Sequence, residues 1–256
     1  MIILKKLLST YKKAKLNYKL PVILGVNESG KAEFADLSDL KHILMTGTTG
    51  SGKSMFEHTI LSTLISFFTP KQLRLYLVDM KLVEFQSYEG LPHLLAPINN
   101  YDIDRVYAGL EWLIDEKNRR LRIGDEINKC SYIVVIIDTF SDLMVDNSQK
   151  FEGYITKLIN RASEVKMHAI MSDSRPSPDV YTPLIRKLFP TKICFNVSKA
   201  EDSKLIIGKS GGELLKGVGD MLFVAPDSAE VRIQAPYISD DQINKIINSL
   251  HKPKGS

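Results

Sequence analysis

The sequence predicts an α/β fold in which helices flank a mostly parallel central sheet, and three observations support this class. Short apolar runs alternate along the chain with longer stretches whose apolar residues recur at helical spacing. Residues 133–137 read Ile-Val-Val-Ile-Ile, an uninterrupted β-branched run that is typical of a parallel strand buried on both faces. A glycine-rich segment, residues 47–54, joins one of the apolar runs to a helical stretch. Together they favour parallel strands connected by crossing helices.

Local signals predict the individual elements. Residues 27–30, Asn-Glu-Ser-Gly, form a turn sequence between two apolar runs and predict a hairpin. Pro70 ends the helix that starts near Lys53, because proline cannot continue a helix. The predicted strands are 21–25, 32–37, 42–46, 73–78, 133–137, 168–171, 192–197, 221–225 and 230–234, the last two as an antiparallel pair. The predicted helices are 53–68, 102–122, 151–165 and 239–250.

Composition and charge exclude several classes of protein. With 256 residues, 44% of them hydrophobic and 25% charged, the chain is neither disordered nor too short for a sizeable core. No apolar run approaches the ~20 residues that span a bilayer, so no transmembrane segment is predicted in this chain. Cys130 and Cys194 lack a partner motif, which argues against a disulfide framework or a zinc site. No leader pattern is visible, and we expect a cytoplasmic protein, tethered to the membrane only through other regions or partners.

The positive charge is concentrated in one segment. The first 20 residues carry six lysines and no acid, whereas the remaining 236 residues hold 28 basic and 30 acidic side chains. Residues 3–15 have the pattern of an amphipathic helix, which suits either contact with DNA or acidic lipid, or docking on the domain through its apolar face. We favour docking. Any contact of the body with nucleic acid must therefore come from local loops.

Residues 47–54, Gly-Thr-Thr-Gly-Ser-Gly-Lys-Ser, match the P-loop of nucleoside triphosphatases. The glycines let the backbone wrap a triphosphate, and the first amides of the following helix donate to its oxygens. In this pattern Lys53 reaches the β- and γ-phosphates and the Ser54 hydroxyl ligates Mg²⁺. The predicted cofactors are therefore ATP and Mg²⁺. The predicted nucleotide-binding residues are Gly47, Thr48, Thr49, Gly50, Ser51, Gly52, Lys53 and Ser54.

The apolar run 133–137 ends in Asp138, as a Walker B strand does. Parallel strands meet at one edge of a sheet, so Asp138 is predicted to lie beside the P-loop and to hold Mg²⁺ directly or through water. An apolar strand that ends in aspartate is common. Because an intact P-loop is present in the same chain, Asp138 nevertheless indicates a Walker B strand.

From about residue 20 to residue 237 the sequence resembles the RecA-like motor domain of the FtsK/SpoIIIE DNA translocases. The segments that carry the resemblance keep their order along the chain: 42–44 leading into the P-loop, 78–81 with Glu84, 88–95, Asp138 with Phe140, 142–144, 175–177, 202–203 and 217–222. The resemblance implies a RecA-like ATPase domain over residues 21–254, preceded by the basic segment 1–20. Gly255-Ser256 is typical of a cloning remnant. The family further implies double-stranded DNA as partner and a homohexameric ring.

The sequence departs from the family at three positions of the hydrolytic apparatus. The family ends its Walker B strand in Asp-Glu, whereas this chain has Thr139 after Asp138, and a threonine cannot serve as a general base near neutral pH. The family's Ala-Thr-Gln before Arg-Pro is replaced by Ser-Asp-Ser at 172–174. The arginine that reaches a neighbouring subunit aligns with Ser163, and Arg161 is the nearest candidate for that trans-acting role.

The departures keep several functions open. The first is the ATP/Mg²⁺-binding motor of a double-stranded DNA translocase that segregates or transfers chromosome or plasmid DNA. The second is a structural subunit that binds ATP without hydrolysing it, and the third is a coupling ATPase of conjugation or protein export. Thr139 is compatible with a natural residue and with a substitution that traps the nucleotide. By the resemblance, Arg175, Arg186 and Lys187 flank the region that faces the DNA pore; they suit phosphate contacts and ordinary surface positions equally.

The position of the catalytic base is a separate hypothesis. Thr139 and Asp173 look like an exchange of the family's carboxylate and hydroxyl between the Walker B strand and the neighbouring sensor strand. In a RecA-like sheet the strand that ends near Asp173 lies between the P-loop strand and the Walker B strand. Asp173 would then polarise the attacking water and Thr139 would position it. The competing interpretation, which we favour, is that Asp173 is a polar loop residue in a site without a base.

Overall fold

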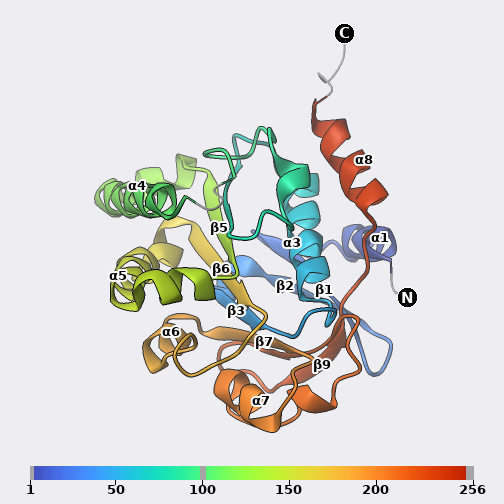
Figure 1. Cartoon of the computed structure of the whole chain (residues 1–256). Helices are drawn as coiled ribbons and strands as arrows, with labels where there is room; N and C mark the ends of the chain where they lie inside the picture. The colour runs from blue at the N-terminus through green and yellow to red at the C-terminus, as the bar shows by residue number, and fades with distance from the viewer. Residues whose placement is uncertain (1–2, 99–101, 252–256) are drawn as a thin grey trace.

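The computed structural model describes residues 3–98 and 102–251, so the predicted remnant at 255–256 lies outside the described residues. These residues form one nine-stranded sheet in the order β2-β1-β9-β8-β7-β3-β6-β5-β4 (Figure 1). The strands are β1 (Pro21–Asn27), β2 (Ala32–Asp36), β3 (Ile43–Thr46), β4 (Leu73–Asp79), β5 (Tyr132–Asp138), β6 (Met167–Asp173), β7 (Thr191–Phe195), β8 (Asp220–Val224) and β9 (Val231–Gln234). The helices are α1 (Leu4–Ala14), α2 (Leu37–Leu40), α3 (Lys53–Phe67), α4 (Ile103–Arg122), α5 (Ser141–Ile159), α6 (Pro183–Leu188), α7 (Ala200–Ile207) and α8 (Asp240–His251).

The sheet is mixed, with a parallel half that carries the predicted motifs. Strands β7, β3, β6, β5 and β4 run parallel to one another, as the β-branched run in β5 predicts. On the other side of β7 the strands β8, β9, β1 and β2 pair antiparallel, which confirms both predicted hairpins. The α/β class is confirmed. The predicted placement of β6 between β3 and β5 is also correct.

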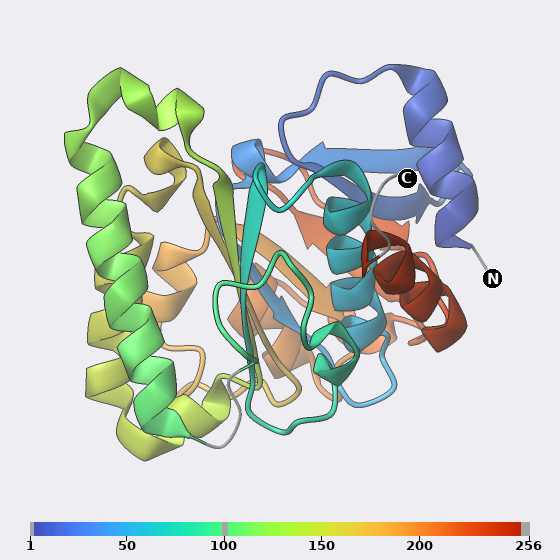
Figure 2. The same cartoon turned by 90° about the horizontal axis from the view of Figure 1, so that it is seen from above.

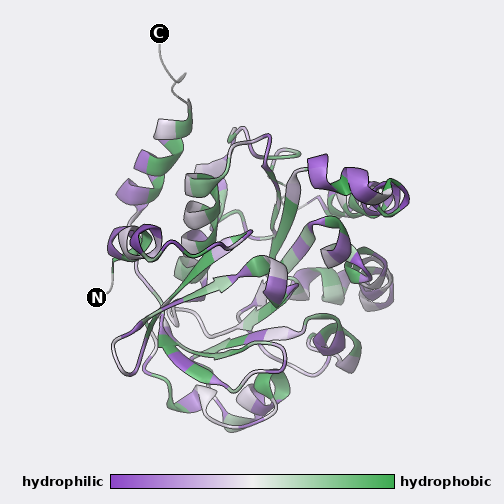
Figure 3. Cartoon of the chain, turned by 180° about the vertical axis from the view of Figure 1, so that it is seen from behind, coloured by the Kyte–Doolittle hydropathy of each residue, from purple (hydrophilic) through white to green (hydrophobic). Residues whose placement is uncertain are grey.

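Helices cover both faces of the sheet (Figure 2). On one face α4 and α5 pack over β4, β5 and β6, and on the other α3, α8 and α1 lie together. Each face has its own core of fully buried side chains, for example Phe56 on the α3 side and Phe151 on the α5 side. The strands are largely hydrophobic while the helices carry polar residues outward, which is the distribution that α/β packing requires (Figure 3). Within the described residues no helix combines the length and hydrophobicity needed to cross a bilayer.

The basic N-terminal segment forms the predicted amphipathic helix and packs on the domain. Leu4, Leu7 and Tyr11 of α1 are buried in the same core as α3. The Tyr11 ring meets Phe34 and Phe67 edge-on, with centroids 5.4 and 5.3 Å away. The lysines of α1 are exposed on the opposite side. This packing supports the docking interpretation of the segment.

The structure corrects the helix predicted at 151–165. Helix α5 begins ten residues earlier, at Ser141, and a separate 3₁₀ turn covers Ala162–Val165. The earlier start was hidden by the polar run around Asn147, which has non-helical backbone angles (φ −160°, ψ 91°). Its side-chain oxygen accepts the Lys150 amide at 2.9 Å, so Asn147 caps the second half of α5. The sequence prediction found only that second half.

Besides the four-residue α2, two short helices were not predicted. Helix α6 lies between the predicted strands 168–171 and 192–197, where Pro183 occupies the first turn and Thr182 caps it by accepting the Ile185 amide. Helix α7 follows β7 and ends at Gly208 in a left-handed conformation (φ 81°). Both are too short to show a helical period.

Candidate nucleotide site

The carboxyl edge of the parallel strands brings the predicted site residues together. The P-loop connects β3 to α3, while Asp79, Asp138 and Asp173 are the last residues of β4, β5 and β6. Because these strands are parallel, all of their carboxyl ends lie at one edge of the sheet. This is the edge on which α/β proteins place their ligands.

The P-loop backbone has the conformation that its glycines permit. Gly50 and Gly52 have φ of 82° and 102°, which side chains rarely adopt. A Cβ on Gly52 would lie 2.2 Å from the Gly219 amide nitrogen, so only glycine fits where the two loops touch. The loop is also tied to β7, because the Thr48 amide donates to the Asn196 carbonyl at 2.9 Å. The P-loop is therefore fixed by contacts on two sides, with the loop at Gly219 and with Asn196 after β7.

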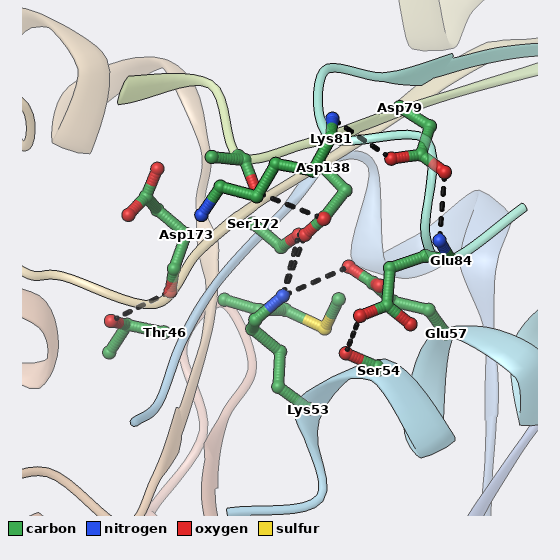
Figure 4. Close-up of polar contacts among 12 residues, drawn as sticks. Thr46, Lys53, Ser54, Glu57, Asp79, Lys81, Glu84, Asp138, Ser172 and Asp173 are labelled. Carbon is green, nitrogen blue, oxygen red and sulfur yellow. Dashed lines mark hydrogen bonds and ion pairs between the residues drawn. The ribbon is translucent and has the colours of Figure 1, made fainter. Parts of the chain in front are cut away.

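Lys53 lies among carboxylates at the centre of the site (Figure 4). It is 7% exposed, and its Nζ lies 2.6 Å from Asp138 Oδ1 and 3.9 Å from Glu57 Oε1. Burial disfavours the charge of Lys53, but the Glu57 and Asp138 carboxylates outweigh it and raise the pKa of Lys53 above its usual range. Burial likewise opposes ionisation of Asp138, yet Lys53 and the neighbouring hydroxyls hold the pKa of Asp138 below its usual value. The lysine is a cation and Asp138 an anion at neutral pH.

Glu57 is a feature that the sequence analysis missed. It is fully buried on α3, one turn after Lys53, and burial raises its pKa to about 8 despite the opposing charge of Lys53. A glutamate between the apolar Phe56 and Ile60 of this helix was the available signal. Its carboxyl group faces the same lysine as Asp138, with Oε1 3.9 Å from Lys53 Nζ.

Glu84, which the sequence analysis named only as part of the family resemblance, is the second site residue that it missed, and it reaches the site from the loop after β4. Its Oε1 accepts the Ser54 hydroxyl at 2.8 Å, which places a carboxylate beside the predicted Mg²⁺ ligand (Figure 4). Asp79 fixes the loop, because its Oδ2 accepts the amides of Glu84 and Phe85 at 2.8 and 2.9 Å. Burial is the main cause that raises the pKa of Glu84. In the sequence, only the spacing from Asp79 to Glu84 could have indicated that the loop after β4 folds back toward Ser54.

Thr139 lies beside Asp138 but presents no carboxylate. Its hydroxyl donates to Asp138 Oδ2 at 3.0 Å. Its φ of 57° is unusual for a β-branched residue, and such strained conformations cluster at functional sites. Thr139 occupies the position at which the sequence analysis expected the family's catalytic glutamate. Its side chain therefore only donates a hydrogen bond to Asp138.

Asp173 does not line the cavity. It is 1% exposed, and both carboxylate oxygens accept backbone amides: Oδ1 from Arg175 at 2.8 Å and Oδ2 from Ser141 at 2.9 Å. In Figure 4 its carboxylate points away from Lys53. The structure thus places the predicted base in a loop-fixing position. The neighbouring Ser172 is closer to the chemistry, since its hydroxyl donates to Asp138 Oδ1 at 2.7 Å.

The cavity that these residues enclose has a volume of about 480 Å³. Glu84 and Asp138 are the acids in its lining, and Lys53 and Lys81 are the bases. The rest of the lining comes from the P-loop and adjoining residues: Thr48, Thr49, Gly50, Gly52, Ser54, Met55, Val83, Thr139 and Ser174. An amide-lined hollow at a helix start, with a buried lysine and a hydroxyl, suits a polyphosphate.

The basic residues predicted to contact DNA or a neighbouring subunit lie outside this cavity. Arg175 and Lys187 are exposed, whereas the Arg186 guanidinium donates to the carbonyls of Tyr181 and Leu205 and so holds α6 in place. Arg161 is exposed between α5 and β6, where it pairs with Glu164 at 2.8 Å. Of the three pore candidates, Arg175 and Lys187 have free access to solvent.

The P-loop, its strand order and the aspartate at the end of β5 define an α/β domain of the P-loop NTPase class. The FtsK/SpoIIIE family model matches residues 4–128. The chain is 36% identical to the DNA translocase FtsK of Leptospira interrogans over 255 residues, which cover 91% of this chain and 27% of that protein. It is 37% identical to the DNA translocase FtsK of Chlamydia trachomatis over 273 residues, 96% of this chain and 34% of that protein. The domain therefore belongs to the FtsK/SpoIIIE family, and it spans about a third or less of the length of these relatives.

Solved structures agree with the fold. The pCW3 conjugation coupling protein TcpA, in its monomer form with ATPγS, matches with a TM-score of 0.79 and 25% identity over 93% of this chain and 72% of that one. The cytoplasmic domain of the type VII secretion ATPase EccC of Thermomonospora curvata matches with a TM-score of 0.81 and 20% identity, over 93% of this chain and 32% of that chain. The second match supports the fold alone.

Proposed function

We propose that this domain binds ATP with Mg²⁺ in the cavity at the end of β3. The observation that carries the proposal is the convergence of the P-loop amides, the buried Lys53 and Asp138 at one edge of the sheet. The amides and Lys53 would hold the phosphates. Ser54 and Asp138 offer the oxygen ligands that Mg²⁺ prefers, and Glu84 adds a carboxylate beside Ser54. Mg²⁺ bound with a nucleotide neutralises charge on the β- and γ-phosphates.

We further propose that the domain is the motor of a double-stranded DNA translocase that works in the cytoplasm as a homohexameric ring. Membership of the FtsK/SpoIIIE family supports this proposal, since the related proteins from Leptospira and Chlamydia carry the name DNA translocase. The exposed Arg175 and Lys187 are candidates for contacts with DNA phosphates. Arg161 is a candidate for completing the site of a neighbouring copy, for which it would have to leave Glu164.

A second candidate function is a subunit that binds ATP and does not hydrolyse it. Thr139 favours it, because its hydroxyl only supports Asp138, and Asp173 is engaged with backbone amides. A third is a coupling ATPase of conjugation or protein export, which the likeness to TcpA favours. For that function the cargo would differ while the nucleotide chemistry stayed the same.

The test is ATP turnover by the full chain with Mg²⁺, with and without long duplex DNA, beside Lys53→Ala as control. A translocase hydrolyses ATP faster when duplex DNA is present, and Lys53→Ala abolishes that turnover. Tight ATP binding with negligible turnover selects the structural subunit. Absence of binding to both ATP and DNA contradicts the proposal.

A further inference from the structure

A groove separate from the nucleotide cavity lies between α1 and α8. Two views of the molecule show these helices side by side next to α3 (Figures 1 and 2). Their first turns are close together, because the Leu4 amide donates to the carbonyl of Tyr237, just before α8, at 3.1 Å. The groove has a volume of about 360 Å³ and shares no described lining residue with the nucleotide cavity.

The walls of this α1–α8 groove are largely aliphatic. Leu4 and Ile238 are buried where they line it, whereas Leu8 of α1 and Ile246 of α8 are only half-buried. Half-buried aliphatic side chains keep part of their apolar surface accessible. Covering that surface with an apolar group is favourable, because it removes the surface from water.

The charged residues of the groove have one sign. Lys5 of α1 and Lys245 of α8 both line it and are exposed, and none of the described lining residues is acidic. Asp241, one turn before Lys245, lies outside the lining. Lys12, two turns after Lys5, continues the row of exposed lysines along α1. The groove therefore suits an anion that carries an apolar chain.

This combination discriminates between the anionic partners of a basic segment. Duplex DNA offers phosphates to the lysines but no apolar group to the walls of the groove. An acidic phospholipid offers both, since its acyl chain suits the aliphatic walls and its phosphate suits the lysines. A volume of about 360 Å³ is also that of a site for one ligand molecule.

We propose that the α1–α8 groove binds an anionic phospholipid of a membrane surface, with an acyl chain between Leu8 and Ile246 and the headgroup phosphate between Lys5 and Lys245. The positive charge of the first 20 residues then has a partner, although the apolar face of α1 is used for packing. The attraction between lysines and an anionic surface is screened by salt. The contact does not depend on the proposed nucleotide site.

Three variants separate the charges from the apolar walls. Lys5→Glu/Lys245→Glu reverses the charge at the groove, and both side chains are exposed, so the variant is expected to fold. Lys187→Glu/Lys204→Glu is the matched control, with the same change of net charge at exposed positions of α6 and α7. Ser66→Gln keeps every charge and places an amide among the aliphatic side chains, from an exposed position at the end of α3.

The experiment is co-sedimentation of the full chain with phosphatidylcholine vesicles that contain or lack phosphatidylglycerol. The wild type is expected to bind only the vesicles with phosphatidylglycerol, and less tightly at high salt. Lys5→Glu/Lys245→Glu is expected to weaken binding at least about 25-fold, since each lysine at an anionic surface contributes about fivefold. Ser66→Gln is expected to weaken it about fivefold, because a buried amide would lack a partner. The control variant is expected to bind as the wild type does.

Four results would overturn the proposal. The first is equal binding of the wild type to both kinds of vesicle, or binding to neither. The second is an equal loss of binding in the Lys5/Lys245 variant and in the control, which would mean that net charge alone acts. The third is wild-type binding by Ser66→Gln, because an acyl chain would then not occupy the groove. The fourth is a Lys5/Lys245 variant that loses duplex DNA in a filter-binding assay and keeps the vesicles, which would make this surface a DNA contact.

Discussion

At the scale of single residues, the site combines a complete phosphate cradle with an altered strand end. Lys53 and Asp138 form a buried pair at 2.6 Å, and Ser172 and Thr139 donate hydroxyl groups to the same carboxylate. A strand-end glutamate could polarise water there, but Thr139 cannot. Besides Asp138, the acidic side chain in the lining of this cavity is Glu84.

We predict that Thr139→Glu raises ATP turnover. General-base assistance contributes about 10²–10⁴-fold, so the variant should gain turnover on that scale if the site lacks only its base. Steady-state ATP hydrolysis with duplex DNA measures this. The comparison is Asp173→Asn, which loses one of the two acceptors for the amides of Arg175 and Ser141 but no group that lines the cavity, so turnover should fall by far less than that factor. Loss of turnover in Asp173→Asn, with no gain in Thr139→Glu, would mean that Asp173 acts as the base.

Two buried histidines make the stability of the domain depend on pH. Burial lowers the pKa of His42 to about 3 and also lowers the pKa of His168. His42 Nδ1 accepts the Ala169 amide at 3.1 Å, which requires a neutral ring. The unfolded chain therefore binds more protons than the folded one below about pH 6.5, and stability falls as the pH drops through that value.

We predict that His42 alone costs about 2 kcal/mol of unfolding free energy between pH 7 and pH 5. Urea unfolding at both pH values measures the loss. In His42→Gln the pH dependence should be smaller by that amount, whatever the variant does to stability at pH 7. An unchanged pH dependence in His42→Gln would show that the ring is protonated in the folded domain.

At the scale of elements, α1 illustrates how a basic segment can be structural. Its buried side chains join the α3 core, and the first amide of α1 donates to the Tyr237 carbonyl at 3.1 Å. The lysines are exposed, and the Lys12 ammonium lies 5.6 Å from the centroid of the Phe67 ring. The apolar face explains why the helix forms at this place.

We predict that Leu7→Ala lowers the unfolding free energy by about 2–4 kcal/mol, because it leaves a cavity in the shared core. Lys13→Ala, on the exposed side of the same helix, should change it by less than about 0.5 kcal/mol. Urea denaturation gives both values. Equal, small effects would mean that α1 is detached from the domain in solution.

At the scale of the whole molecule, the sequence predicted what depends on local pattern and order along the chain. The strand-to-helix position of residues 47–54, the place of Asp138 at the end of β5 and the position of β6 between β3 and β5 were predicted correctly. The roles of these residues toward ATP and Mg²⁺ stay predictions. The orientation of Asp173 was not predictable, because it depends on an amide 32 residues away at Ser141. Glu84 escaped prediction for the same reason, since its approach to Ser54 depends on a loop that Asp79 folds back.

We predict that the chain assembles into a hexameric ring on DNA. With ATP, Mg²⁺ and duplex DNA present, sedimentation velocity should detect a hexamer of the chain, if a neighbouring copy completes the site as proposed above. The charge reversal Arg161→Glu should then reduce hexamer formation or turnover, while the same change at Lys13 should not. A chain that stays monomeric under all of these conditions would contradict the ring.

The most direct measurement of the central claim is displacement of a triplex-forming oligonucleotide from duplex DNA. A motor that moves along DNA strips the third strand in a reaction that needs ATP and Mg²⁺. We predict displacement by the wild-type chain and none by Lys53→Ala, in which the phosphate contact is lost. ATP hydrolysis that duplex DNA does not stimulate, together with an intact triplex, would contradict the assignment of this domain as a DNA translocase motor.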